Sequence, residues 1–313
     1  MKFLLVLLLL VVSVPFGASA GTPGSERVLF EADSIYHHIV VAEDRVARYL
    51  RFDRSLQSGM LLGAPHESPF LYAAYAHVGF IFTPQAKRVL VIGLGGASIP
   101  KRFLRDYPEI TVEVAEIDPM VLDVAKRFFA VRDDPRLRIF VQDGRLFLRR
   151  SERKYDMIII DAFFAESIPF HLTTREFYEL ARSRLAPGGV IVANLIGALE
   201  GPQSSLFRAV YKTYAEVFTG LYLFPIALRP YNDVKDIRNI MLVASAERSL
   251  TRTEIMERAR RVAPRIKYRD FLKYAGDYYD EPISVDDLPV LTDDYAPVDT
   301  LIPLYHWTPV KRP

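Results

Sequence analysis

The stretch VLVIGLGGAS, Val89 to Ser98, decides the fold that this 313-residue chain can adopt. Its first four residues are apolar, as in a strand that is buried on both faces of a sheet. A glycine-rich loop follows from Gly93, and Pro100–Asp106 continues with helical spacing. Glycines let the backbone turn sharply and approach a ligand, and the start of a helix offers unpaired N–H groups. Ser98 stands where the fingerprint G-x-G-x-x-G requires glycine, so the loop alone fits a ligand-binding turn or a plain tight turn.

The same alternation of short apolar runs and helical segments continues along the chain. Apolar runs lie at Ile110–Ala115, Leu137–Val141, Met157–Ile160 and Val190–Ala193, with helical spacing at Pro119–Phe129, Gly144–Ser151 and Thr174–Leu185 between them. Such runs are typical of a parallel sheet covered by helices on each side. The sequence therefore predicts an α/β fold with a Rossmann-like sheet over residues 81–250. A helix near Ser205–Val217 and antiparallel strands at Leu221–Pro225 and Ile240–Ala244 are expected to finish it.

The helix expected at Thr174–Leu185 has the best local end signals. Thr173 is its expected cap, and Glu176 stands three residues on, as in a capping box. Pro187-Gly188-Gly189 is expected to separate the helix from the next strand.

The regions that flank the predicted sheet have different patterns. Apolar and polar residues alternate at Arg27–Phe30, Ile39–Ala42 and Arg45–Phe52, which predicts a small antiparallel β unit. A helix is expected at Ser68–Gly79, so that residues 21–80 hold the β unit and the first helix. Residues 251–313 are expected to form a helical extension and tail, with a helix near Thr253–Val262.

The first twenty residues read as a secretory signal. Lys2 supplies a positive start, Phe3–Val14 an apolar run, and Ala18-Ser19-Ala20 a cleavage site of small residues. The apolar run is shorter than the roughly 20 residues that span a bilayer. We therefore expect an exported, periplasmic or extracellular protein, with membrane association only if residues 1–20 are retained.

Composition excludes several classes of partner and site. Lys and Arg number 40 against 38 Asp and Glu, and the net charge of +2 gives no electrostatic reason to expect nucleic acid as a partner. The chain has no cysteine, which excludes disulfides and thiolate metal sites. Its six histidines show no metal-ligand spacing, so no metal site is expected.

Acidic residues end three of the predicted parallel strands. Glu116 lies about twenty residues beyond the glycines, where a carboxylate accepts hydrogen bonds from ribose hydroxyls. Asp143 precedes Gly144 after the third strand, at a position suited to an adenine amino group, and Asp161 follows Met157–Ile160 next to aromatic residues. Open parallel sheets bind ligands at the carboxyl ends of their strands, so these side chains are expected to meet at one nucleoside site. The spacing does not separate a nicotinamide from a sulfonium cofactor.

These motifs, in this order and spacing, resemble the spermidine synthase family of aminopropyltransferases. The likeness covers roughly residues 30–245 and rests on Ser34-Ile35-Tyr36-His37-His38-Ile39, Leu50 to Gln57, the glycine loop, Glu116-Ile117-Asp118, Asp143-Gly144 and Asp161. Two further stretches, Ile168 to Glu176 and Leu291 to Pro297, look more like the spermidine synthase-like branch often fused to bacterial membrane segments.

The resemblance implies a class I methyltransferase-type sheet after the small antiparallel β unit, and a homodimer. It implies transfer of an aminopropyl group from decarboxylated S-adenosylmethionine, or S-adenosylmethionine itself as donor, to a small amine such as putrescine. In family terms, the donor is bound by Gly93, Gly95, Glu116 at the ribose, Ile117, Asp143 and Gly144 at the adenine, and His37. Asp161 is then the general base, and Tyr72, Gln57 and Glu166 lie around the amine.

The amine side departs from the family pattern. The family's aspartate in the glycine loop falls at Gly96, its glutamine after the early tyrosine at His37, and its His-Glu pair at Ala73-Ala74. The second aspartate of its Asp-x-x-Asp motif falls at Phe164, which leaves Glu166 as the nearest carboxylate. Three functions therefore stay open: an aminopropyltransferase, an S-adenosylmethionine-dependent methyltransferase, and a non-catalytic protein that binds adenosyl compounds. Export sharpens the third, because adenosyl sulfonium compounds are made inside cells.

Overall fold

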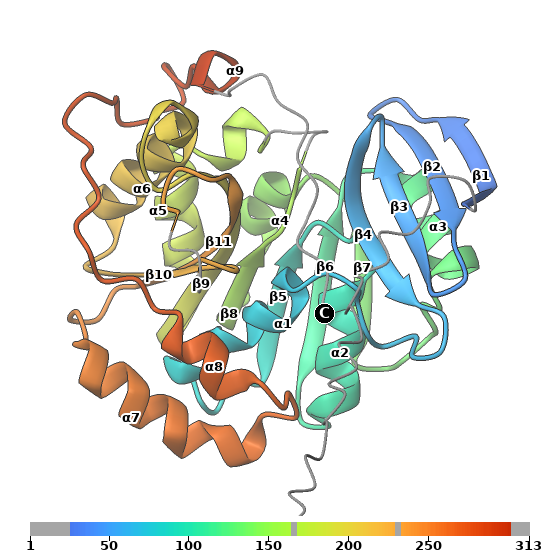
Figure 1. Cartoon of the computed structure of the whole chain (residues 1–313), viewed down its shortest axis with the longest axis horizontal. Coiled ribbons are helices and arrows are strands. Elements are labelled where there is room, and N and C mark those ends of the chain that lie inside the picture. The colour runs from blue at the N-terminus through green and yellow to red at the C-terminus, as the bar shows by residue number, and fades with distance from the viewer. Residues whose placement is uncertain (1–25, 164–167, 229–232, 302–313) are drawn as a thin grey trace, which may run out of the picture.

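The computed structural model of the chain describes residues 26–163, 168–228 and 233–301. Its centre is a seven-stranded sheet with the order β10-β11-β9-β8-β5-β6-β7 (Figure 1). The strands are β5 (Arg88–Ile92), β6 (Thr111–Glu116), β7 (Leu137–Val141), β8 (Tyr155–Ile160), β9 (Leu185–Gly197), β10 (Gly220–Pro225) and β11 (Arg238–Ser245). Strands β5 to β9 are parallel, and β11 and β10 join antiparallel. The predicted Rossmann-like, methyltransferase-type α/β fold is confirmed.

The sheet is covered on both faces because its strands are apolar on both. In β5, Val89 and Val91 belong to one buried cluster, and Leu90 and Ile92 to the other. The first cluster includes side chains from α2 (Ser98–Asp106), α3 (Pro119–Phe128), α7 (Arg252–Val262) and α8 (Phe271–Gly276). The second includes side chains from α4 (Gly144–Arg150), α5 (Arg175–Ser183), α6 (Ser205–Val217) and α9 (Val298–Leu301). The glycine loop therefore leaves a strand that is fixed from both sides.

The N-terminal unit is a four-stranded antiparallel sheet that lies beside the β7 end of the molecule (Figure 1). Its strands are β1 (Arg27–Asp33), β2 (His38–Glu43), β3 (Ala47–Phe52) and β4 (Ser55–Leu61). The sequence predicted the first three strands and missed β4. In β4 the buried residues Ser58, Gly59 and Met60 stand next to one another, so the strand lacks the alternation that reveals a half-buried strand.

The helix expected at Ser68–Gly79 is only partly present. An α-helix of four residues, α1 (Tyr72–Tyr75), continues as the 3-10 helix η1 (Ala76–Ile81). All ten of these residues are buried, in contact with neighbours that include α2, α7 and α8. Packing on all sides, rather than an amphipathic period, determines the conformation of this segment.

The expected ends of the helix now labelled α5 were wrong. Thr174, not Thr173, caps it by accepting a hydrogen bond from the N–H of Phe177 at 3.3 Å. The hydroxyl of Thr173 instead donates to the carbonyl of Phe170, and Glu176 accepts from the N–H of Asp293. Pro187-Gly188-Gly189 lies inside β9 rather than before it.

The C-terminal region begins with the expected helix, α7, which has a capping box formed by Thr251 and Glu254. No helix in the three described ranges is both long and apolar enough to cross a membrane. The predicted signal, residues 1–20, lies outside the described residues, as do Phe164 and Glu166.

Candidate active site

One cavity of about 250 Å³ opens at the carboxyl ends of β5, β6 and β8. The expected donor-binding residues Gly93, Gly95, Glu116, Ile117, Asp143, Gly144 and His37 all line it. So do Asp161, Tyr72 and Gln57, which were expected at the reacting end. Glu166 falls outside the described residues. The fold thus brings together every expected site residue whose position is described.

The glycine loop that forms the cavity floor needs an unusual backbone. Gly93 and Gly95 have φ values of +96° and +50°, and Ala97, which precedes α2, has +57°. Residues other than glycine rarely adopt positive φ, so Ala97 is a position of local strain. The N-terminal sheet supports the end of the loop, because the Ser98 hydroxyl donates to the carbonyl of Gly59 at 3.2 Å.

Glu116 is held against the loop by backbone donors. Its carboxylate accepts the N–H of Leu94 at 2.8 Å and the N–H of Asp118 at 2.9 Å. Burial raises the pKa of Glu116 to about 7, although these two hydrogen bonds oppose the rise. In its ionised form, a carboxylate at this position beside the loop can accept hydrogen bonds from the hydroxyls of a bound sugar.

Asp118 connects this region to the N-terminal unit. Its carboxylate accepts the Ser34 hydroxyl at 2.5 Å, and it caps α3 by accepting the N–H of Met120 at 2.8 Å. The Ser34 oxygen in turn accepts the N–H groups of Tyr36 and His37 at 3.0 and 2.9 Å. These bonds hold Tyr36 and His37 at the cavity, so the N-terminal unit supplies one wall of the site.

Asp143 uses both carboxylate oxygens. Oδ1 accepts the N–H of Leu146 at 2.8 Å and caps α4, and Oδ2 lies 2.7 Å from Nε2 of His171. Burial acts to raise the pKa of Asp143, but the hydrogen bonds from His171 and Leu146 outweigh it and lower the pKa. A ligand amino group at this position must share Oδ2 with His171 or displace it.

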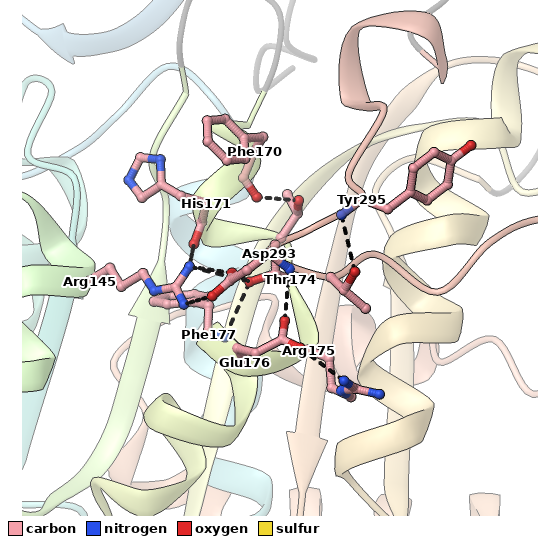
Figure 2. Close-up of polar contacts among 11 residues, drawn as sticks. Arg145, Phe170, His171, Thr174, Arg175, Glu176, Phe177, Asp293 and Tyr295 are labelled. Carbon is pink, nitrogen blue, oxygen red and sulfur yellow. Dashed lines mark hydrogen bonds and ion pairs between the residues drawn. The ribbon is translucent and has the colours of Figure 1, made fainter.

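The loop that carries His171 is fastened by a segment from the far end of the chain, Leu291–Tyr295, which we call the C-terminal strap. Figure 2 shows Asp293 of the strap against Arg145 and Thr174. The Asp293 carboxylate accepts two hydrogen bonds from Arg145, at 2.6 and 2.5 Å, and the Thr174 hydroxyl at 2.7 Å. Arg145 also donates to the carbonyl of His171 at 3.1 Å. Asp293 therefore ties α4, the cap of α5 and the cavity wall together.

Asp161 directly follows β8 and lines the cavity. Its Oδ1 accepts the side-chain amide of Asn194 at 2.9 Å. Burial raises the pKa of Asp161 to about 6, and the hydrogen bond from Asn194 opposes the rise. Tyr72 lines the cavity together with Asp161. Burial, and to a smaller extent the charge of Asp161, raises the pKa of the Tyr72 phenol, which therefore stays neutral. Asp161 can accept a proton at neutral pH.

At Gly96, one of the departures from the family pattern on the amine side, packing limits the room for a side chain. A Cβ on Gly96 would lie 2.8 Å from the Ser58 hydroxyl and 2.9 Å from the ring of Phe129, so no side chain fits there without rearrangement. Among the described residues that line the cavity, the carboxylates are those of Glu116, Asp143 and Asp161. Asp161 is therefore the described carboxylate available to an amine.

Sequence reasoning missed two contributors to the site, His171 and Asn194. Asn194 follows the apolar run Val190–Ala193 just as Asp161 follows Met157–Ile160, so the rule that singled out Asp161 could have found it. His171 carried no such signal, because its contact with Asp143 depends on the path of the loop before α5. Within residues 26–163, 168–228 and 233–301, no three His, Asp or Glu side chains group as metal ligands.

Comparisons with known proteins point to one family. The model of the spermine/spermidine synthase domain matches residues 70–233. The polyamine aminopropyltransferase of Vibrio vulnificus (strain CMCP6) is 34% identical over 220 residues, which are 67% of this chain and 72% of the relative.

Solved structures share the fold. A probable spermidine synthase from Corynebacterium glutamicum ATCC 13032 aligns with a TM-score of 0.63 and 24% identity, over 74% of this chain and 86% of that one. A spermidine synthase in complex with the transition-state analogue AdoDATO aligns with a TM-score of 0.61 and 23% identity, over 82% of this chain and 85% of that one.

Proposed function

The chain belongs to the spermine/spermidine synthase family, and on that premise we propose that it transfers an aminopropyl group from decarboxylated S-adenosylmethionine to a small amine such as putrescine. One observation carries the proposal: Glu116, Asp143 and Asp161, from the ends of three parallel strands, line a single cavity with the glycine loop. Two of these carboxylates suit a nucleoside, and the third suits a reacting amine.

The donor half of the cavity fits an adenosyl compound. We assign Glu116, which accepts the N–H of Leu94, to the ribose hydroxyls, and Asp143, which accepts the N–H of Leu146, to the adenine amino group. A spermidine synthase with this fold binds the transition-state analogue AdoDATO. Decarboxylated S-adenosylmethionine is the donor of spermidine synthases, and we assign it to this cavity.

The reaction is a single displacement. The amine nitrogen forms a bond to the carbon of the aminopropyl group that is attached to the sulfonium. The bond between that carbon and sulfur breaks with its electron pair left on sulfur, and neutral methylthioadenosine departs. The nitrogen must be unprotonated to attack, whereas an alkyl ammonium has a pKa of about 10.4 by analogy with lysine. Asp161 accepts the proton that the amine loses.

In this proposal the residues that line the cavity accelerate the transfer in two ways, by positioning the reactants and by accepting a proton. A positioned carboxylate contributes roughly 10²- to 10⁴-fold by general base catalysis. Holding nitrogen, carbon and sulfur in line adds to that factor because a bimolecular step becomes effectively unimolecular. Tyr72 and Gln57 line the cavity with Asp161 and are our proposed contacts of the amine.

Release of methylthioadenosine from labelled donor, with putrescine and related amines offered one at a time, tests the proposal. We expect turnover by the purified chain and its loss in Asp161→Asn. Release of S-adenosylhomocysteine from S-adenosylmethionine would show a methyltransferase instead. Tight binding of methylthioadenosine without turnover of any amine would show a binding protein, an outcome that the lack of room at Gly96 favours.

We also propose export, on the sequence of residues 1–20 alone. A compartment reporter fused to the first thirty residues tests it, and a reporter that stays in the cytoplasm would contradict it. Pairing of two copies is a second proposal, drawn from family resemblance. Light scattering of the purified chain measures its mass against the 35.7 kDa of a single copy.

A further inference from the structure

Three polar side chains lie in a row across β8, β9 and β11. Oδ1 of Asp161 accepts the Nδ2 amide of Asn194 at 2.9 Å, and Oδ1 of Asn194 accepts the Nδ2 amide of Asn239 at 2.9 Å. Asn194 and Asn239 are 4% and 3% exposed. Amides this deeply buried need hydrogen-bond partners, and here each asparagine has one in the row.

The row follows one face of the sheet. Met157 and Ile159 of β8, Val190 and Val192 of β9, and Met241 and Val243 of β11 all belong to the same buried cluster. Side chains alternate along a strand, so Asp161, Asn194 and Asn239 continue these rows toward the cavity. Register supports the alignment, because Asn194 pairs with Met241 and Asn239 with Ile196 across the antiparallel β9–β11 pair.

Two neighbours orient the Asn194 amide. The ionised Asp161 carboxylate can only accept, which directs the Asn194 NH₂ group to Asp161, and Asn239 donates to the Asn194 Oδ1 atom on the other side. Rotation of the Asn194 amide by half a turn would place its oxygen against the Asp161 carboxylate and its NH₂ group against the NH₂ group of Asn239. Both hydrogen bonds would be lost, and Asn239 therefore acts on Asp161 through Asn194.

We propose that Asn194 and Asn239 are positioning residues that commit Oδ1 of Asp161 to a hydrogen bond and leave Oδ2 as the oxygen that accepts the proton of the attacking amine. Within the part of the chain that the structure describes, no donor bonds to Oδ2 of Asp161. The chemical step rests on the proposed function: Oδ2 takes the proton that the ammonium must lose, the neutral nitrogen then forms its bond to carbon, and the carbon–sulfur bond breaks with its electron pair left on sulfur. The two amides neither gain nor lose a proton.

Other titratable groups line the same cavity and must be kept apart from the effect. They are Tyr72 of α1, Tyr36 and His37 of the N-terminal unit, Glu116 at the end of β6, Asp143 after β7 and His171 of the loop before α5. The substitutions below leave all six in place. A change in the titration of Asp161 can then be followed by a label on Asp161 itself.

The test compares Asn194→Leu and Asn239→Leu with Met241→Leu, a volume-conserving control on the same face of β11. Asn194→Leu removes the hydrogen bond that favours the ionised carboxylate, so the acidic limb of kcat/KM should move up by about one pH unit. Asn239→Leu leaves the Asn194 amide in place but removes the partner that orients it, so the limb should move in the same direction by a smaller amount. The double variant should shift no further than Asn194→Leu, because Asn239 acts through Asn194. Met241→Leu should leave the limb in place.

A second measurement makes the result independent of turnover. The ¹³C NMR titration of the Asp161 carboxyl carbon, identified by its absence in Asp161→Asn, should shift upward in both asparagine variants, and more in Asn194→Leu than in Asn239→Leu. Unfolding midpoints establish that each variant is folded, and Asn239→Leu alone carries the test if Asn194→Leu does not fold. An unshifted Asp161 titration in a folded Asn239→Leu protein overturns the inference. Absence of turnover with a shifted titration overturns the proposed function and leaves the positioning role intact.

Discussion

The backbone of Gly93 lies directly against the carbonyl group of Asp161. A Cβ on residue 93 would be 2.2 Å from that carbonyl oxygen, and the N–H of Asp161 donates to the carbonyl of Ile92 at 2.9 Å. The loop that we assign to the donor and the residue that we assign as general base are therefore in direct backbone contact.

Gly93→Ala should destabilise the folded protein and weaken donor binding. The added methyl group meets backbone, and the φ of +96° is unfavourable for alanine, so we expect a loss of about 3 kcal/mol or more in unfolding free energy. Denaturant unfolding measures it. Gly63→Ala is the matched control, because a Cβ there meets nothing within 4 Å. Equal losses in both variants would contradict the contact.

Asp161→Asn should abolish turnover while stabilising the fold at alkaline pH. Burial raises the Asp161 pKa from 3.8 to about 6, so the residue stabilises the folded state most below pH 3.8, and this contribution is lost as the pH rises through 6. The amide avoids the charge, which predicts a gain of about 2 to 3 kcal/mol at pH 8. Unfolding curves of both proteins at pH 5 and pH 8 measure the difference. A variant that is less stable at pH 8 would refute a raised pKa.

Binding of methylthioadenosine should strengthen as the pH rises through about 7. In our proposal the ionised Glu116 accepts hydrogen bonds from the ribose hydroxyls. Burial raises its pKa to about 7, so Glu116 is largely protonated at pH 6. We expect the dissociation constant of methylthioadenosine to be about tenfold lower at pH 8 than at pH 6. Calorimetry measures it. Glu116→Gln should bind methylthioadenosine weakly and with little pH dependence, whereas Asp161→Asn should keep the pH dependence. The reverse pattern would show that the pH dependence comes from Asp161 and not from Glu116.

Asp143→Asn should reduce the preference for adenine over hypoxanthine. The Asp143 carboxylate can only accept, which suits the adenine amino group and opposes the hypoxanthine oxygen. We expect the wild type to prefer methylthioadenosine to methylthioinosine by about 10- to 100-fold, and the variant by less than tenfold. Asp143 also caps α4, and loss of that cap should affect both ligands alike, so it cancels in the ratio of their dissociation constants. An unchanged ratio would remove Asp143 from base recognition.

Asp293→Asn should raise the KM for the donor without moving the acidic limb of kcat/KM. The substitution weakens the paired hydrogen bonds from Arg145, which also holds the carbonyl of His171. Because Asp293 is partly exposed, we expect a modest increase of about three- to tenfold in KM. Amide hydrogen exchange at residues 170–172 should also become faster. Asp294→Asn, in the adjacent residue, is the control, and equal effects would show that the strap does not act through Arg145.

Local pattern was enough to predict the central sheet but not the helix ends. Buried parallel strands are short apolar runs, and β5 to β9 could be found from them. The cap of α5 could not, because Thr173 and Thr174 are equivalent in sequence. The choice between them depends on the Asp293 carboxylate, which accepts the Thr174 hydroxyl from far along the chain.

The sequence by itself determined that a glycine loop and the acidic residues Glu116, Asp143 and Asp161 would share one site, because the carboxyl ends of parallel strands meet at one edge of the sheet. Only the tertiary structure decided how those carboxylates are held. Asn194 reaches Asp161 across 33 positions of sequence, and Asn239 reaches Asn194 across 45. Such contacts depend on strand order and register, which are set by the packing of the whole sheet and leave no periodic trace in the chain.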